Sequence, residues 1–176
     1  PRRQTELIIS EEELRALTEK MTIPFKLACY LMYYCGLRIS ETWKLRNSDI
    51  GDDDTILIRR SKNLVTRYAI MHREVRALLN QMLVLGQRPS PQSRVVPVRT
   101  ATAIYGAVKR HAAEIGVSRL HPHSLRHAYA TRLVESGFPI SDVMMLLGHT
   151  NIQTTARYLH SSVASVRDKY KEKGWL

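Results

Sequence analysis

Cysteine is scarce in this chain of 176 residues. Its two cysteines, Cys29 and Cys35, both lie in one apolar segment. The sequence contains neither a Cys-x-x-Cys pair nor the mixed Cys and His spacing of zinc ligands. We therefore predict two buried thiols instead of a disulfide, and no cysteine-based metal site.

Long hydrophobic runs are missing as well. The longest, LACYLMYYCGL at residues 27–37, is well short of the roughly 20 apolar residues that a membrane-spanning helix requires, and Arg38 follows it directly. The first ten residues, PRRQTELIIS, carry no signal-peptide pattern. We therefore predict no membrane partner, and the hydrophobic content of 44% is that of an ordinary globular chain.

Acidic residues are few relative to basic ones. The chain has 16 Asp and Glu against 27 Lys and Arg, a formal net charge of +11 and a pI near 10. Such a field attracts polyanions, first nucleic acid and second an anionic membrane, although a basic protein without either partner is the simpler alternative. The acidic cluster at residues 52–54 falls in an expected turn, so the carboxylate site of a two-metal nuclease is not indicated.

The hydrophobic periodicity predicts one domain of the mainly α (α+β) class. Ser10 and Glu13 have the spacing of a capping box, and Gly36 is placed to end a helix. Two β-rich runs, at residues 55–60 and 67–71, predict a small antiparallel three-stranded sheet or hairpin. Helices are expected at residues 11–20, 23–35, 73–85, 100 or 102 to 115, 123–136, 141–147, 151–158 and 162–173, with a short one near residue 40.

Residues 120–160 combine side chains that can cleave a phosphodiester without a metal ion. They include His123, Arg126, His149 and Tyr158, and Arg38 lies upstream in CGLRISETWKL. Arginine offers planar, permanently charged donors to phosphate oxygens. A tyrosine nucleophile would conserve the bond energy in a phosphotyrosine, but its phenol has an ordinary pKa near 10 and needs a cation or base beside it. The two histidines titrate in the useful range.

These motifs and their spacing resemble the tyrosine recombinase (phage-integrase-like) family. GLRISETWKL resembles the family's first motif, whose catalytic arginine corresponds to Arg38. HPHSLRH resembles the HxLRH motif and yields His123 and Arg126, while LLGH yields His149. The family's tyrosine corresponds to Tyr158, nine residues later. The resemblance covers about residues 10–165.

The resemblance also implies a role for each residue. The two arginines would clamp the scissile phosphate of double-stranded DNA, the tyrosine would attack it, His123 would handle the tyrosine proton and His149 would hydrogen-bond the phosphate. In the family a hairpin lysine protonates the leaving 5′ oxygen; alignment on the hairpin favours Lys62, five residues before Arg67. The implied product is a 3′-phosphotyrosine with a free 5′ hydroxyl, formed without a metal, ATP or another cofactor.

The family's organisation leads to further expectations. The whole chain, 1–176, is expected to be one catalytic domain with a core at 10–160 and a tail at 161–176. Residues 162–176 are expected to pack on a neighbouring protomer in the tetramer and on their own domain in the isolated monomer. Family members usually carry an N-terminal DNA-binding domain, which we expect this chain to lack. On DNA the family forms a tetrameric synapse; the isolated domain is expected to be a monomer. The resemblance implies a cytoplasmic, nucleoid-associated protein of bacterial, archaeal or phage origin.

Several alternatives stay open at this stage. A type IB topoisomerase shares the chemistry, a DNA-binding module could carry a dead site, and a metal-dependent nuclease is a third rival. Glu41 could orient an active-site group or face solvent; His127 is expected to be structural and His121 to lie outside the site. The candidate phosphate contacts, each of which could be plain surface charge, are Arg59, Arg60, Lys44, Arg46, Arg119 and Lys109.

Overall fold

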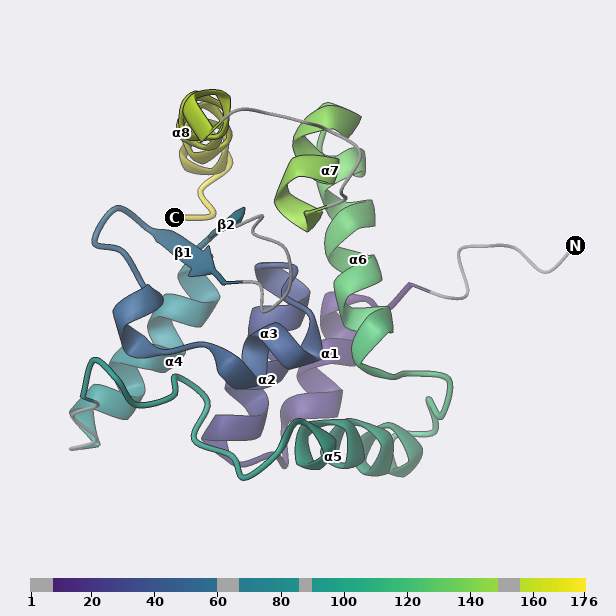
Figure 1. The fold of residues 1–176 in the computed structure, drawn as a ribbon. Coiled ribbons are helices and arrows are strands. Elements are labelled where there is room, and N and C mark those ends of the chain that lie inside the picture. Colours follow the sequence, from purple (N-terminus) through teal and green to yellow (C-terminus); the bar gives the residue numbers. More distant parts are fainter. Residues whose placement is uncertain (1–7, 60–66, 86–89, 149–155) are drawn as a thin grey trace, which may run out of the picture.

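The computed structural model describes residues 8–59, 67–85, 90–148 and 156–176, and for residues 156–162 it describes the helical backbone alone (Figure 1). The described residues form a mainly helical domain with one small sheet, which confirms the predicted class. The helices are α1 (Glu11–Thr18), α2 (Ile23–Tyr34), α3 (Ile39–Lys44), α4 (Arg73–Val84), α5 (Ala101–Glu114), α6 (Pro122–Glu135), α7 (Ile140–Leu147) and α8 (Ala156–Glu172); the strands are β1 (Thr55–Ile58) and β2 (Arg67–Ile70).

Local side chains explain where several helices begin. The Ser10 hydroxyl accepts a hydrogen bond from the Glu13 amide at 3.1 Å, and the Glu13 carboxylate accepts one from the Ser10 amide at 3.0 Å. This is the expected capping box, which satisfies two amides that the first turn of α1 leaves without helical partners. The Thr100 hydroxyl caps α5 in the same way, accepting from the Ala103 amide at 3.1 Å.

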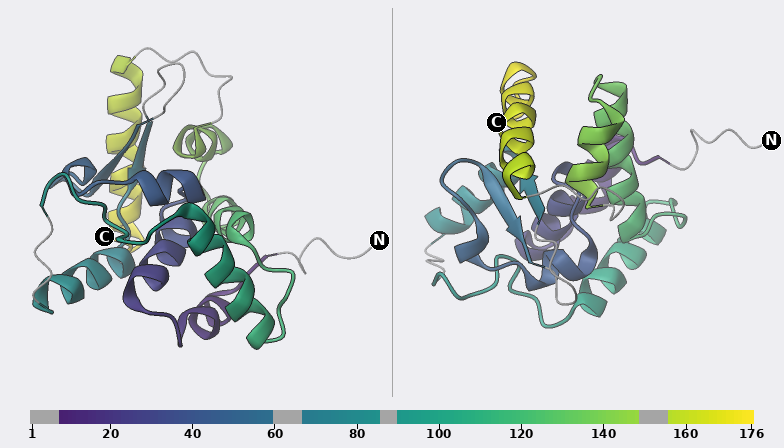
Figure 2. Two further views of the ribbon diagram at one scale, coloured as in Figure 1. Left: turned by 60° about the horizontal axis from the view of Figure 1, so that its bottom comes forward. Right: turned by 45° about the horizontal axis from the view of Figure 1, so that its top comes forward.

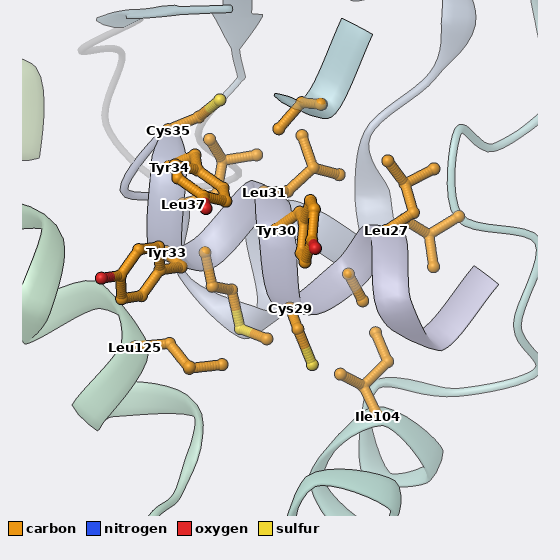
Figure 3. Close-up of a cluster of buried hydrophobic side chains, with 14 of the residues drawn as sticks. Leu27, Cys29, Tyr30, Leu31, Tyr33, Tyr34, Cys35, Leu37, Ile104 and Leu125 are labelled. Atoms are coloured by element: carbon orange, nitrogen blue, oxygen red, sulfur yellow. The ribbon is translucent and has the colours of Figure 1, made fainter. Parts of the chain in front are cut away.

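Helix α2 is the centre of the fold. Its residues 27–34 are all buried, and the helix contacts α1, α3, α4, α5 and α6. A helix that is apolar on every side is stable only when neighbours cover every side, which is the arrangement seen here (Figure 3). Cys29 and Cys35 are free thiols in this core, and burial raises the pKa of each to about 12. The prediction of buried, unpaired cysteines is therefore confirmed.

The turn after α2 requires glycine. Gly36 has a φ of +69°, and a Cβ at this position would lie 2.4 Å from two ring carbons of the buried Tyr129. Any larger residue would meet both backbone strain and a steric clash. The close approach places the chain that follows, with Arg38 at the start of α3, beside α6.

The sheet has two strands. Strands β1 and β2 pair antiparallel, with Thr55 opposite Ile70 and Ile58 opposite Arg67. In the described part of the chain no third strand joins them, so of the two predicted forms the structure shows the hairpin. The neighbouring segment forms a single bridge, Ile50 to Ile56, because a 3-10 helix at Asn47–Asp49 interrupts its extended backbone.

The C-terminal helix differs from the prediction. We expected separate helices at 151–158 and 162–173, but α8 runs without interruption from Ala156 to Glu172. This stretch contains no glycine or proline to stop it. Helices α7 and α8 lie at one end of the domain, and α4 and α5 at the other (Figures 1 and 2). Trp175 then stacks on Phe138, which attaches the C-terminus to α6, α7 and β2 in the same molecule.

None of the helices in the described ranges combines the length and apolar character needed to cross a bilayer.

Candidate active site

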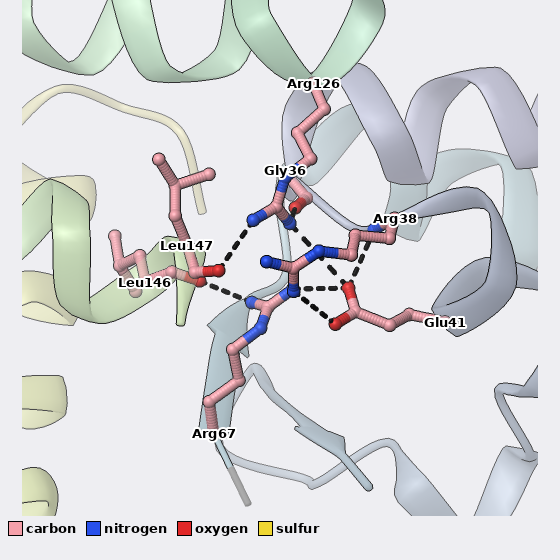
Figure 4. A network of polar contacts seen from close by, with 7 residues as sticks. All are labelled: Gly36, Arg38, Glu41, Arg67, Arg126, Leu146 and Leu147. Atoms are coloured by element: carbon pink, nitrogen blue, oxygen red, sulfur yellow. Dashed lines mark hydrogen bonds and ion pairs between the residues drawn. The ribbon is translucent and has the colours of Figure 1, made fainter. Parts of the chain in front are cut away.

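Three arginines from distant parts of the chain meet at one carboxylate. Arg38 comes from the start of α3, Arg67 from the start of β2 and Arg126 from the middle of α6, and all three surround Glu41 (Figure 4). The distances from the guanidinium nitrogens to the Glu41 carboxylate are 3.0 Å for Arg38, 2.6 Å for Arg67 and 3.7 Å for Arg126. We call these four residues the arginine cluster.

Glu41 is held in place by its own helix. It occupies the third position of α3, and its carboxylate accepts the Arg38 backbone amide at 2.7 Å. A carboxylate in the first turn also meets the positive end of the helix dipole. Burial alone would raise the pKa of Glu41, but Arg67 and the amide and guanidinium of Arg38 together hold the pKa below its ordinary value. Glu41 is therefore ionised at neutral pH, and the alternative in which it faces solvent is wrong.

Arg126 is anchored by backbone carbonyls. Its Nη1 donates to the carbonyl of Gly36, and its Nη2 donates to the carbonyl of Leu147 at 2.6 Å. Burial, with repulsion from Arg67 and Arg38, lowers its pKa to about 10, so Arg126 still carries its charge at neutral pH. These bonds fix the plane of the guanidinium, and each Nη has a second N–H available for a ligand.

The cluster carries more positive than negative charge. Among the described residues, Glu41 is the one carboxylate that pairs with any of its three arginines. Three cations and one anion leave two positive charges uncompensated. A pre-organised site with this excess, shielded from water, can stabilise the negative charge that builds up on a phosphate during displacement.

An open hollow gives access to Arg126. It has a volume of about 430 Å³ and is lined by His121, His123, Ser124, Arg126, His127, Ala130 and Leu147. His123 lies one turn before Arg126 on α6 and is exposed. The rings of His121 and His123 are 6.1 Å apart, so the expectation that His121 lies outside the site is wrong. Burial, followed by repulsion from His123 and Lys109, lowers the pKa of His121.

A second hollow, of about 560 Å³, adjoins the cluster at Glu41. Its basic lining residues are Lys44, Arg46, Arg59 and Arg94, three of which are phosphate contacts proposed from the sequence. Two other candidates do not line it: Arg119 pairs with Glu13 at 2.7 Å, and Lys109 donates to the Ser118 carbonyl at 2.6 Å. The candidates grouped beside the cluster are therefore Lys44 at the end of α3, Arg46 just after α3 and Arg59 just after β1, whereas Arg60 lies outside the described residues.

The structure describes the side chains of three of the six residues expected to be catalytic. Arg38 and Arg126 meet at Glu41, and His123 lines the same hollow as Arg126. Lys62 and His149 lie outside the described residues. Tyr158 lies on α8, in the part described by its backbone alone.

Metal binding receives no support from the described ranges, which hold no group of three or more His, Cys, Asp or Glu residues arranged to bind a metal ion.

Arg67 is the residue that the sequence reasoning missed. It was noted only as the first residue of a strand, yet its side chain is 2% exposed. A signal was present: side chains alternate along a strand, so Arg67 shares a face with Ala69, which is buried against the core. An arginine on that face needs a buried partner.

Comparisons with known proteins identify the family of this chain. The model of the phage integrase family matches residues 6–165. A tyrosine recombinase of Thermosipho africanus is 34% identical over 170 residues, covering 90% of this chain and 59% of the relative. The chain thus spans about three fifths of that relative's length.

Solved structures share the fold. The XerA recombinase matches with a TM-score of 0.71 at 24% identity, covering 94% of this chain and 64% of that one. The Tn1549 transposon integrase, solved in complex with transposon right end DNA, matches with a TM-score of 0.68 at 18% identity, covering 95% and 66%.

Proposed function

Because the chain belongs to the phage integrase family, we propose that it is the catalytic domain of a tyrosine-type site-specific DNA recombinase. It cuts and rejoins double-stranded DNA through a 3′-phosphotyrosine intermediate. The observation that carries this proposal is the convergence of Arg38 and Arg126, 88 positions apart, on the Glu41 carboxylate beside an open hollow. This pairing is what a phosphate clamp without a metal ion requires.

The clamp acts through charge and orientation. The scissile phosphate enters the hollow and accepts hydrogen bonds from the free N–H groups of Arg126 and from Arg38, whose side chain is 31% exposed. Glu41 and the backbone carbonyls hold the guanidinium planes before DNA arrives, so little reorganisation is needed in the transition state. Each such pre-organised donor contributes on the order of 3 kcal/mol.

The remaining groups move protons and form the new bond. The Tyr158 oxygen attacks phosphorus while the bond from phosphorus to the 5′ oxygen breaks. His123 accepts the phenol proton, Lys62 donates a proton to the departing 5′ oxygen, and His149 hydrogen-bonds a phosphate oxygen. The energy of the broken bond is kept in the phosphotyrosine, so the reverse attack by a 5′ hydroxyl reseals the strand without ATP or another cofactor.

The DNA duplex is held mainly by charge. A net charge of +11 and the basic side chains around the second hollow support binding along the phosphate backbone. The Tn1549 integrase was solved with DNA bound, which supports the same partner for this chain. A tetrameric synapse on DNA, docking of the tail on a neighbouring protomer and a cytoplasmic location belong to the same proposal.

A covalent capture experiment tests the function. The chain is incubated, with a chelator present, with a library of nicked duplexes whose central segment is randomised, because a nick lets the cleaved end diffuse away and traps the adduct. Protein–DNA adducts that survive denaturation are recovered and sequenced. The wild type should yield adducts on a defined sequence, and Tyr158→Phe should yield none.

Each other result has a defined meaning. Adducts that persist in Tyr158→Phe would contradict tyrosine chemistry, and adducts lost on chelation would indicate a metal-dependent nuclease. DNA binding without adducts in either protein would leave two readings, a DNA-binding module with a dead site or a catalytic domain that needs the N-terminal domain usual in the family, and repeating the assay with that domain attached would separate them. Relaxation of supercoiled plasmid with no recombinant products would favour a type IB topoisomerase.

A further inference from the structure

Arg67 is a fully buried cation with two well-defined partners. Its side chain is 2% exposed, against 31% for Arg38 and 10% for Arg126. Its Nη2 donates to Glu41 at 2.6 Å, and its Nη1 donates to the carbonyl of Leu146 (Figure 4). A duplex cannot reach a side chain this deep, so any role in the proposed reaction has to act through other residues.

Stability alone explains this arginine poorly. The Nε of Arg67 is buried and has no hydrogen-bond partner among the described residues. Burying a guanidinium is costly even when it is paired, and apolar side chains of similar volume often replace buried ion pairs without loss of stability. The two contacts of Arg67 therefore indicate a role in holding its partners in position.

Arg67 and Arg126 share Glu41 as a partner and bind adjacent carbonyls at the end of α7. Arg126 is held by Glu41, by the Gly36 carbonyl and by the Leu147 carbonyl. Arg67 binds the same oxygen of Glu41, Oε2, and the carbonyl one residue before Leu147. Arg67 thus binds one support of Arg126 directly, Glu41, and binds the residue next to a second support, Leu147.

The Leu146 and Leu147 carbonyls belong to the last turn of α7. Gly148, with a φ of +65°, ends this helix in a left-handed conformation. Carbonyls at a helix C-terminus lack helical partners and carry partial negative charge, so two guanidinium groups are well suited to hold them. Arg67 and Arg126 together fasten the end of α7 to α3, α6 and β2.

We propose that Arg67 is a positioning residue for DNA cleavage. By linking Glu41 to the end of α7, it fixes the guanidinium of Arg126 in the orientation that clamps the scissile phosphate, and it does so without touching DNA. This inference rests on the proposed function and deepens it. It predicts a defect in the rate of the chemical step and not in DNA affinity.

The test uses two substitutions and one control. Arg67→Met has similar length and no charge; Arg67→Lys keeps the charge, but its single ammonium cannot bind Glu41 and the Leu146 carbonyl in a planar fork. Arg76→Met is the control, because Arg76 forms an arginine–aspartate pair of 2.5 Å with Asp54 outside the cluster. Each protein is assayed in single turnover on the duplex recovered by covalent capture.

In Arg67→Met the rate of adduct formation should fall about 100-fold, the size of effect seen when a pre-organised donor is displaced. The DNA dissociation constant should stay within about threefold of wild type. Arg67→Lys keeps the charge and should still be at least about tenfold slow. The control should cleave at the wild-type rate. Loss of affinity in proportion to rate, or full recovery of rate in Arg67→Lys, would overturn the proposal.

A substrate with sulfur in place of the 5′ bridging oxygen separates two ways of acting. A thiolate leaves without needing a proton, so this substrate bypasses the leaving-group acid. If Arg67 acts through the phosphate clamp, the sulfur substrate should leave the rate defect of Arg67→Met unchanged. Recovery of the rate would show that Arg67 acts through the leaving-group acid, and would overturn the proposal.

One measurement is independent of the proposed function. Amide hydrogen exchange on the DNA-free protein should be faster in the last turn of α7 in Arg67→Met, with α2 still protected. Unchanged exchange in α7 would overturn the inference even if the wild type cleaves DNA. A wild type that forms no adduct while α7 loosens in the variant would instead contradict the function and leave the structural link intact.

Discussion

The core around α2 and the arginine cluster around Glu41 are both largely shielded from water, but they bury different chemistry. Around α2 the buried groups are aliphatic and aromatic side chains and two thiols. In the cluster they are three guanidinium groups that share one carboxylate. The first arrangement stabilises the folded state, because folding removes apolar surface from water. The second is costly to desolvate, and in the proposed function a phosphate supplies the missing negative charge.

This difference suggests that changes in the two regions should separate stability from catalysis. A change in the core should lower the free energy of unfolding and leave the chemistry of folded molecules intact. A change in the cluster should slow the chemical step and leave the free energy of unfolding nearly unchanged. The predictions below test that separation, beginning with the largest expected effect.

Arg126→Met should reduce the single-turnover rate of adduct formation about 1000-fold, because it removes a pre-organised donor to the scissile phosphate. The free energy of unfolding should change by less than about 2 kcal/mol, since Glu41 keeps Arg38 and Arg67 as partners and no buried charge is left unpaired. Capture assays and urea melts on the same preparation measure both. A rate within tenfold of wild type, or a variant that does not fold, would break the separation.

Leu31→Ala should do the opposite. Leu31 is fully buried in α2, and its truncation leaves a cavity that should lower the free energy of unfolding by about 3 kcal/mol. The cleavage rate per folded molecule should stay at the wild-type value. Val84→Ala, at an apolar position 87% exposed, is the matched control and should change neither quantity. A slower chemical step in Leu31→Ala would show that the core and the cluster are coupled.

His72 should make stability depend on pH. It is buried, stacks on Tyr34, and caps α4 by accepting the Glu74 amide at 3.2 Å. Burial, followed by repulsion from Arg132 and Arg73, lowers its pKa from 6.5 to about 3. Between these values the unfolded chain binds a proton that the folded chain does not, so stability is complete above the unfolded pKa and is lost as the pH falls.

By about pH 5 the loss from His72 should reach about 2 kcal/mol, since each pKa unit corresponds to 1.36 kcal/mol. Denaturant melts from pH 7 down to pH 4 measure it. His72→Asn keeps a capping side chain but cannot titrate, so its melts should be flatter over this range. His127→Asn, which removes an exposed histidine, should retain the wild-type slope. Equal slopes in all three proteins would contradict the assignment to His72.

Arg59→Gln should have the smallest effect. Arg59 lines the second hollow and pairs with Asp49 at 2.7 Å, but its side chain is 66% exposed. Losing one phosphate contact should weaken DNA binding by about threefold and lower the slope of log affinity against log salt by about one. Lys20→Gln, an exposed lysine outside both hollows, should leave the slope unchanged. Equal slopes for the two variants would place the duplex elsewhere.

The helices could be predicted from the sequence because their signals are local. The Ser10 and Thr100 caps, the fully apolar pattern of α2 and the turn at Gly36 each involve residues within a few positions of one another. The errors arose where local signals are weak. Nothing in residues 156–172 marks a helix end, and the 3-10 helix at Asn47–Asp49 depends on contacts with residues 90–94.

Part of the arginine cluster could be predicted from the sequence, and part could not. The sequence by itself determined which side chains are available: Arg38 and Arg126 could be selected from their motifs, because the chemistry of phosphate transfer requires those residue types. Only the tertiary structure decided that Glu41 is buried, that Arg67 joins it, and that the end of α7 supplies the carbonyls which hold Arg126. These contacts join residues 26, 79 and 21 positions apart. A charge can be buried at this site only when the packing of α3, β2, α6 and α7 brings all of its partners together. No pattern of neighbouring residues in the sequence predicts those contacts.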